Sequence, residues 1–116
     1  MKHTYVLLLV IVWSIQLVNA QPLKMMTYNI RLDLASDGEN DWTHRKEYFT
    51  SQIKFYEPDI FGVQEALPNQ VTDIATYLPA YSYVGTGRDG IGKGESSNIY
   101  YKKGRFTVQK EGTFWL

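Results

Sequence analysis

The sequence predicts a mixed α/β (α+β) fold, and three observations support this prediction. The chain of 116 residues is 44% hydrophobic and 21% charged, which is the composition of a globular domain. Residues 23–78 alternate between strand-like and helix-like periodicity, as in a strand–helix–strand–helix start. Short alternating runs separated by turn residues follow, and these indicate antiparallel strands. A start of this kind that continues into hairpins is typical of a mixed sheet with helices packed on it.

Residues 1–20 have the pattern of a secretory signal peptide. Lys2 precedes an apolar run from Tyr5 to Trp13, and residues 18–20 supply a small-residue cleavage site. An uncleaved membrane anchor is the alternative, but the run is shorter than the roughly 20 residues that a membrane-spanning helix needs. We therefore expect export to the periplasm or beyond, with residues 21–116 as the mature part and no membrane span after cleavage.

Charge and cysteine content exclude several functions. The formal net charge is 0 at pH 7, so the composition gives no support for the basic surface that usually binds long nucleic acids. Small anionic substrates remain possible. The chain has no cysteine, which excludes disulfides, thiolate nucleophiles and zinc–thiolate sites.

The first predicted elements are a strand, a loop and a helix. Residues 23–31 alternate apolar and polar positions and predict the strand, and the polar, acidic residues 32–41 predict the loop. Asp41 or Thr43 can cap a helix that runs to about Tyr56, just before a proline. The predicted apolar face of this helix consists of Tyr48, Phe49, Gln52, Ile53 and Tyr56.

The rest of the chain predicts a central strand, a second helix and shorter strands. Residues 58–65 form an apolar run opened by proline, which indicates a buried strand. Pro68 opens a helix to residue 78 whose apolar residues keep i, i+3, i+4, i+7 spacing. The glycine-rich residues 85–95 predict a loop. Strands are predicted at residues 81–85, 96–102, 106–110 and 113–116, with the hairpin turn of the middle pair at 103–105.

The central strand ends in a carboxylate, Glu65. A side chain at the carboxyl end of a core strand reaches a crevice while the sheet fixes its backbone, which suits a metal ligand. Capping of the next turn or pairing with a lysine would explain Glu65 equally well. A metal site therefore needs support from other residues.

Four motifs together supply that support. They are Asn29 within Thr27-Tyr28-Asn29-Ile30, Gln64-Glu65 after Asp59-Ile60, Asp41-Trp42 with Arg45, and the loop from Gly87 to Glu95 followed by Ile99-Tyr100-Tyr101. In order and spacing the sequence resembles the endonuclease/exonuclease/phosphatase superfamily, the deoxyribonuclease I-like proteins, and within it the secreted bacterial branch. The resemblance implies a two-sheet β-sandwich flanked by helices, with a divalent metal ion, usually Mg²⁺ (or Mn²⁺), at one end.

The resemblance also implies roles for individual residues. Glu65 would be the metal ligand, and Asn29 would contact the metal or the scissile phosphate. Arg88 would bind substrate phosphate, although a loop arginine paired with the neighbouring Asp89 is an equal alternative. Glu95 would line the same cleft, or else end the loop as a surface charge. Trp42 and Arg45 would form a wall that recognises substrate, or else a packing residue and an ion pair at the start of the helix.

One residue departs from the family pattern. Arg31 stands where the apurinic endonuclease branch has an acid, two residues after the asparagine. It leaves open whether a second carboxylate, such as Asp33, approaches the metal.

The function implied is hydrolysis of a phosphodiester or phosphomonoester, with a phosphorylated small molecule or a nucleic acid as substrate. The family's catalytic histidine and its partners lie in the carboxyl-terminal half of the fold, and the histidines of this chain are His3 and His44. We therefore expect this chain to be the amino-terminal part of a hydrolase and to be inactive alone. The alternative is a non-catalytic module that binds carbohydrate or protein through Trp42, Tyr81, Tyr83, Tyr100 and Tyr101.

Overall fold

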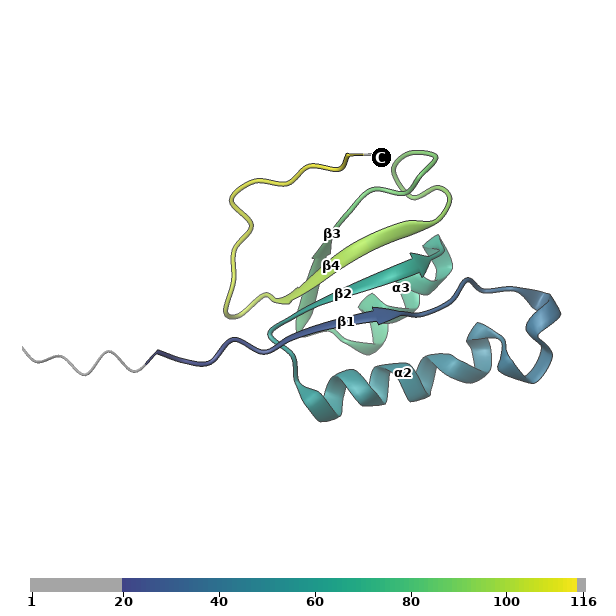
Figure 1. The fold of residues 1–116 in the computed structure, drawn as a ribbon, viewed down its shortest axis with the longest axis horizontal. Coiled ribbons are helices and arrows are strands. Elements are labelled where there is room, and N and C mark those ends of the chain that lie inside the picture. The colour runs from purple at the N-terminus through teal and green to yellow at the C-terminus, as the bar shows by residue number, and fades with distance from the viewer. Residues whose placement is uncertain (1–19, 115–116) are drawn as a thin grey trace, which may run out of the picture.

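The computed structural model describes residues 20–114, which form two α-helices on one face of a four-stranded sheet (Figure 1). The predicted signal peptide lies outside the described residues except for Ala20. Among residues 20–114, no helix has the length and apolar character needed to cross a membrane. In chain order the elements are β1 (Met25–Asn29), the 3-10 helix η1 (Ala35–Asn40), α2 (Trp42–Tyr56), β2 (Ile60–Ala66), α3 (Pro68–Tyr77), β3 (Tyr81–Val84) and β4 (Ser96–Lys102).

The sheet has the strand order β1-β2-β4-β3. β1 and β2 are parallel and are joined through α2, whereas β4 is antiparallel to both of its neighbours, β2 and β3. This confirms the predicted mixed α/β architecture. Within residues 20–114 there is one sheet, so a second sheet of a sandwich does not lie in this part of the chain.

Helix α2 begins and ends as predicted, but its buried face differs. The Asp41 side chain accepts a hydrogen bond from the backbone N–H of His44 at 3.2 Å, and Glu57 ends the helix in the left-handed conformation with φ 48°. Tyr48 is 65% exposed and Tyr56 is 53% exposed, so the predicted apolar face is wrong at these positions. The buried residues of this helix are Trp42, Phe49, Thr50 and Ile53.

The core lies between these helices and the sheet. Phe61 and Val63 of β2 point toward the helices and are fully buried, as are Ile53 of α2 and Ile74 of α3. The ring of Phe61 is stacked on that of Tyr100, with centroids 4.8 Å apart. Each such side chain stabilises the fold by about 1.5–3 kcal/mol through burial, so β2 is fixed firmly at the centre of the sheet.

Two predictions made after β4 are wrong. A turn does form at residues 103–105, where Arg105 N–H donates to Lys102 O at 3.0 Å, but residues 106–110 and 113–114 are not strands. Both edges of β4 are already paired, with β2 and with β3, so a returning strand has no edge to join. Residues 115–116 lie outside the described residues.

The predicted loop at residues 32–41 is also partly wrong, because Ala35–Asn40 form η1. Gly38, with φ 55°, interrupts η1 in a conformation that glycine adopts at little cost. The loop thus has a defined path.

Candidate active site at one end of the sheet

The sheet topology gathers the predicted site residues at one end. β1, β2 and β3 all finish there and β4 starts there, because β1 is parallel to β2 and β4 is antiparallel to β2 and β3 (Figure 1). Asn29 is the last residue of β1, and Glu65 is the last but one of β2. Arg88 and Glu95 lie on the loop that joins β3 to β4 at the same end.

A β-bulge in β2 directs Glu65 to this end. Val63 pairs with Asn98 and Ala66 pairs with Ser96, so β2 contains one residue more than β4 between the two pairs. Glu65 takes the left-handed conformation, with φ 61°. Ala66 then fills the buried position toward the helices and is 0% exposed. Without the extra residue, the alternation of β2 would direct Glu65 into the core.

The Glu65 carboxylate is held by two donors that carry no charge. Asn29 Nδ2 donates to Oε1 at 2.6 Å, and the backbone N–H of Leu32 donates to Oε2 at 3.4 Å. The amide oxygen of Asn29 accepts from the backbone N–H of Arg31 at 2.9 Å, which fixes the orientation of the amide. Asn29 therefore presents its nitrogen to the carboxylate, and in this arrangement its side chain orients Glu65.

Arg45 anchors the segment between β1 and α2. Its Nε donates to Asn40 O at 2.6 Å, its Nη2 donates to Leu32 O at 3.3 Å, and its Nη1 donates to Ile30 O. The guanidinium thus donates its hydrogen bonds to backbone carbonyls. The predicted role in a substrate-recognition wall does not fit this geometry. The clamp instead positions the segment that supplies the Leu32 N–H to Glu65.

Trp42 is a packing residue. It is 2% exposed, and its indole N–H donates to Asp73 Oδ2 at 2.9 Å, so its ring offers no surface to a substrate. The alternative weighed for Trp42, packing at the start of the helix, is the role that the structure supports.

Gln70 completes the support of the site, and the sequence analysis missed it. This side chain is 0% exposed; its Oε1 accepts from Leu67 N–H at 2.9 Å and its Nε2 donates to Arg31 O at 2.8 Å. The signal was a glutamine at the third position of the helix opened by Pro68, where it can cap the helix. Nothing local in the sequence indicates its second bond, to Arg31.

Arg31 and Asp33 point to different partners. Arg31 pairs with Asp37 through two hydrogen bonds of 2.7 Å, and the guanidinium lowers the pKa of Asp37 below its usual value. Asp33 Oδ2 accepts from Asn69 Nδ2 at 2.7 Å, which turns its carboxylate toward α3. A second carboxylate beside Glu65 is therefore not supplied by Asp33 in this geometry.

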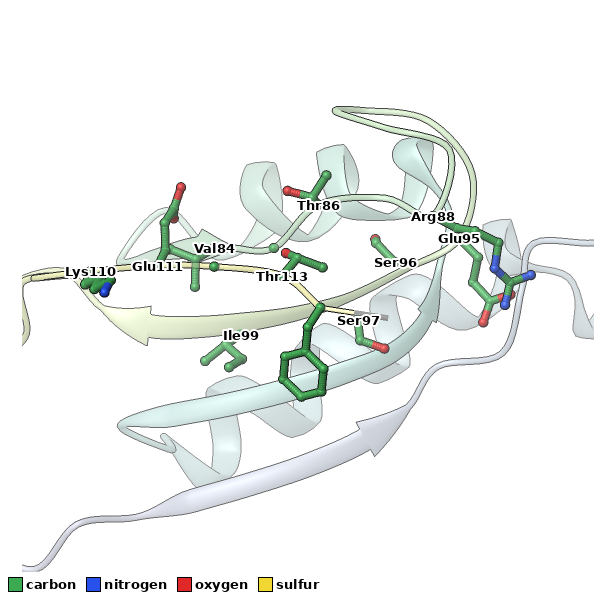
Figure 2. A pocket seen from close by; sticks show the side chains of 13 residues that line it. Val84, Thr86, Arg88, Glu95, Ser96, Ser97, Ile99, Lys110, Glu111 and Thr113 are labelled. Carbon is green, nitrogen blue, oxygen red and sulfur yellow. The ribbon is translucent and has the colours of Figure 1, made fainter. Parts of the chain in front are cut away.

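Arg88 and Glu95 form an ion pair that lines one end of a pocket. Arg88 Nη2 lies 3.6 Å from Glu95 Oε2, and Arg88 N–H donates to Glu95 O at 2.8 Å. The alternative partner considered for Arg88 was Asp89, so that expectation is wrong. The adjoining pocket, of about 650 Å³, lies between the sheet and residues 110–114 (Figure 2).

The donor set fits a hard divalent cation held by one carboxylate. Residues 20–114 contain no group of three or more His, Asp or Glu side chains that could hold a metal together. Mg²⁺ does not need one, since it keeps several waters and is often bound by one or two carboxylates together with substrate phosphates. His44 lies in the first turn of α2 with Nδ1 2.9 Å from Asp41 Oδ1, away from this role.

Comparison with known proteins agrees with this geometry. The model of the endonuclease/exonuclease/phosphatase family matches residues 26–112. The chain belongs to this family. Its superfamily contains hydrolases that act on phosphate esters.

Two solved structures of Bacteroides proteins are similar to this member of the family. An endonuclease/exonuclease/phosphatase from Bacteroides vulgatus is 40% identical with a TM-score of 0.78, covering 80% of this chain and 36% of the other. A mannosyl-6-phosphatase from Bacteroides thetaiotaomicron is 35% identical with a TM-score of 0.75, covering 78% of this chain and 35% of the other. The chain thus spans about a third of the length of these solved structures.

A curated relative is an uncharacterized protein of Acanthamoeba polyphaga mimivirus. It is 28% identical over an alignment that covers 90% of this chain and 16% of the viral protein.

Proposed function

We propose that residues 21–116 form the amino-terminal part of an exported, metal-dependent hydrolase that cleaves a phosphate ester with water. The observation that carries the proposal is the bulge at Glu65. A non-glycine residue in the left-handed conformation costs roughly 1–2 kcal/mol, and here that conformation directs a carboxylate out of the core to the end of the sheet. Membership of a family with phosphoester hydrolases supports the same reading.

Glu65 would hold the cation, Mg²⁺ or Mn²⁺, and Asn29 would keep the carboxylate in place. Glu65 accepts one hydrogen bond on each oxygen, so lone pairs remain for a ligand. A divalent ion bound there would supply stabilisation of the charge that develops at phosphorus. Arg88 and Glu95 lie at the same end and are proposed to line the substrate cleft, each able to bind substrate once their pairing opens.

For the substrate we favour a small phosphorylated compound over a nucleic acid. The net charge of 0 gives no general attraction for a long polyanion. A mannosyl-6-phosphatase is 35% identical over most of this chain. Because the chain spans about a third of the similar structures, we propose that catalysis needs the remaining part of the fold, which would supply the general base.

The test is hydrolysis of sugar phosphates and of short DNA by the full-length protein, with Mg²⁺ and with EDTA. We expect release of phosphate from a sugar phosphate that depends on Mg²⁺ and falls by at least about 100-fold in Glu65→Gln. Glu39→Gln, at an exposed carboxylate of η1, is the matched control and keeps full activity. Hydrolysis that is indifferent to EDTA and to Glu65→Gln would refute the proposal.

The rival proposal of a binding module predicts a different result. Such a module would retain a carbohydrate or protein ligand in Glu65→Gln and would release no phosphate from any substrate. Export has its own test, because a cleaved protein isolated from the periplasm or medium would begin at Gln21.

A further inference from the structure

Arg31 lies at the Glu65 end of the sheet, but its side chain takes no part in the hydrogen bonds that hold Glu65 in place. It follows Asn29 by two residues and precedes Leu32, and both of these donate to Glu65. Arg45, by comparison, is committed to backbone carbonyls. Within the described part of the chain, the guanidinium of Arg31, unlike that of Arg45, is not bound to backbone carbonyls.

The backbone of Arg31 is fixed from two sides in a costly conformation. Its φ is 58°, its N–H donates to Asn29 Oδ1 at 2.9 Å, and its carbonyl accepts from the buried Gln70 at 2.8 Å. Non-glycine residues with positive φ persist where the surroundings enforce them, and they gather at functional sites. Of the three such residues described, Arg31 and Glu65 both belong to this site.

The guanidinium of Arg31 is oriented along one edge only. Asp37 accepts from Nε and from Nη2 at 2.7 Å each, and Asp37 is largely buried with a side chain that is 9% exposed. The Arg31 side chain is 60% exposed. Within residues 20–114, its Nη1 donates no hydrogen bond, so the outer edge of the guanidinium faces solvent with its N–H groups available.

Asp37, not Glu65, is the ion-pair partner of Arg31. The Glu65 carboxylate is bonded to the uncharged donors of Asn29 and Leu32, the second of which follows Arg31 in the chain. The positive charge of Arg31 therefore stays at the Glu65 end of the sheet without pairing with the carboxylate that would hold the cation.

We propose that Arg31 binds a phosphoryl oxygen of the substrate, a phosphomonoester dianion, and that Asp37 is the positioning residue that directs it. The inference rests on the proposed function, because the phosphate it binds is the one beside the Glu65 cation. A guanidinium suits this task because it can donate to two oxygens at once. The competing explanation is that the Arg31–Asp37 pair only stabilises η1.

The experiment measures the binding of inorganic phosphate to the full-length protein in saturating Mg²⁺, by calorimetry at pH 8. In Arg31→Gln the affinity falls by roughly 10- to 100-fold, the loss of one or two charged hydrogen bonds. In Asp37→Asn it falls by less, since the guanidinium remains but is no longer oriented. KM for a sugar phosphate rises in parallel with the dissociation constant for phosphate.

Arg105→Gln is the matched control, because Arg105 is also paired with an aspartate, Asp59, at 2.6 Å, but at the other end of the sheet. It leaves phosphate affinity unchanged. A purely structural role of Arg31 would lower the melting temperature of Arg31→Gln and leave phosphate affinity at the wild-type value, and that result would overturn the inference.

Other outcomes are also decisive. If Arg31→Gln does not fold, Arg31→Lys replaces it; unchanged phosphate affinity there overturns the inference, and about tenfold weaker binding supports it. If the wild-type protein binds Mg²⁺ through Glu65 and substitution of Arg31 leaves phosphate affinity unchanged, only this inference is overturned. Wild-type protein that binds neither Mg²⁺ nor phosphate overturns the proposed function as well.

Discussion

The two carboxylates at opposite ends of β2, Asp59 and Glu65, have opposite surroundings. Asp59, just before the strand, is 4% exposed; it accepts from Lys24 N–H at 2.9 Å and pairs with Lys102 at 3.3 Å and Arg105 at 2.6 Å. The Lys24 hydrogen bond, followed by those from Arg105 and Lys102, lowers the pKa of Asp59 to about 2. Glu65 has no ion-pair partner within residues 20–114 and is bonded to an amide and a backbone N–H.

The difference separates an acid that anchors the fold from one that we propose to bind a metal ion. The acceptor capacity of Asp59 is taken up by three donors, which tie the start of β1, the start of β2 and the end of β4 together. Glu65 is positioned by donors that do not neutralise it, so it keeps its charge for a ligand. A buried carboxylate with two cations is thus evidence of anchoring, and a held but unneutralised carboxylate at a strand end is evidence of binding.

The largest effect expected from this comparison is on metal affinity. Glu65→Gln removes the charge proposed to hold the cation, so we expect Mg²⁺ affinity to fall by at least about 100-fold, measured by calorimetry on the full-length protein. The melting temperature stays close to that of the wild type, because no cation loses its partner. A large fall in melting temperature would show that Glu65, like Asp59, is an anchor.

Asp59→Asn should give the reverse result. Lys102 and Arg105 lose the charge that they share, so the urea midpoint of unfolding falls, while Mg²⁺ affinity at the opposite end of the sheet stays the same. Asp73→Asn, which weakens the pair with Lys46 at 3.3 Å on the helical side, is a milder control. Loss of Mg²⁺ affinity in Asp59→Asn would contradict the separation of the two roles.

The same anchor predicts the acid sensitivity of the fold. The folded-state pKa of Asp59, about 2, lies below its ordinary value of 3.8. Its contribution to stability is therefore fully present above the ordinary value and is lost as the pH falls through this range toward 2. Unfolding curves measured from pH 5 to pH 2 should show a steeper loss in the wild type than in Asp59→Asn.

Gln70→Leu tests a buried side chain that supports the Glu65 end of the sheet. It leaves Leu67 N–H and Arg31 O without their buried partner, so we expect a loss of about 1–3 kcal/mol in the free energy of unfolding. Chemical denaturation measures this loss. Phosphate affinity should also fall, because the backbone of Arg31 is no longer held, and a variant that loses stability but binds phosphate as the wild type does would contradict the supporting role.

The smallest expected effect is that of Glu57→Gly, which is compared with the same change at Glu65. Both have positive φ, but Glu57, with φ 48°, only ends α2. Glu57→Gly should raise the stability of the fold by up to about 1 kcal/mol without changing Mg²⁺ affinity, because glycine adopts this conformation at little cost. Glu65→Gly should relieve similar strain yet abolish Mg²⁺ binding, which thermal unfolding and calorimetry together would show.

Local patterns in the sequence were sufficient for much of the fold. Strand β4 lies at the residues predicted for it, and α2 has its predicted cap at Asp41 and its predicted end at Tyr56. The spacing of apolar residues carries this information, since it reports which face is buried. The strand predicted at residues 106–110 failed because alternation cannot reveal that β4 has no free edge.

The site was predicted less completely, for a physical reason. The contact between Asn29 and Glu65 follows from two parallel strands that end together, and the resemblance named both residues. The ion pair of Arg31 with Asp37 and the hydrogen bond from Gln70 depend on backbone conformations at single residues, which no periodic pattern encodes. The motif led to the prediction that Trp42 and Arg45 contact the substrate. In the structure Trp42 is buried and Arg45 donates to backbone carbonyls, which a motif alone does not reveal.

Because of the bulge in β2, the number of residues between Val63 and Ala66 decides which way the Glu65 side chain points. Asp59 fixes where the strand starts, and one extra residue before Ala66 decides on which side of the sheet the carboxylate emerges. We expect point substitutions at Glu65 to change the chemistry of the site and to leave the path of the chain intact. Removal of a single residue between Val63 and Ala66 would yield a more regular strand that has lost its carboxylate from the site. Among descendants of this sequence, length in this short interval should therefore vary less than composition.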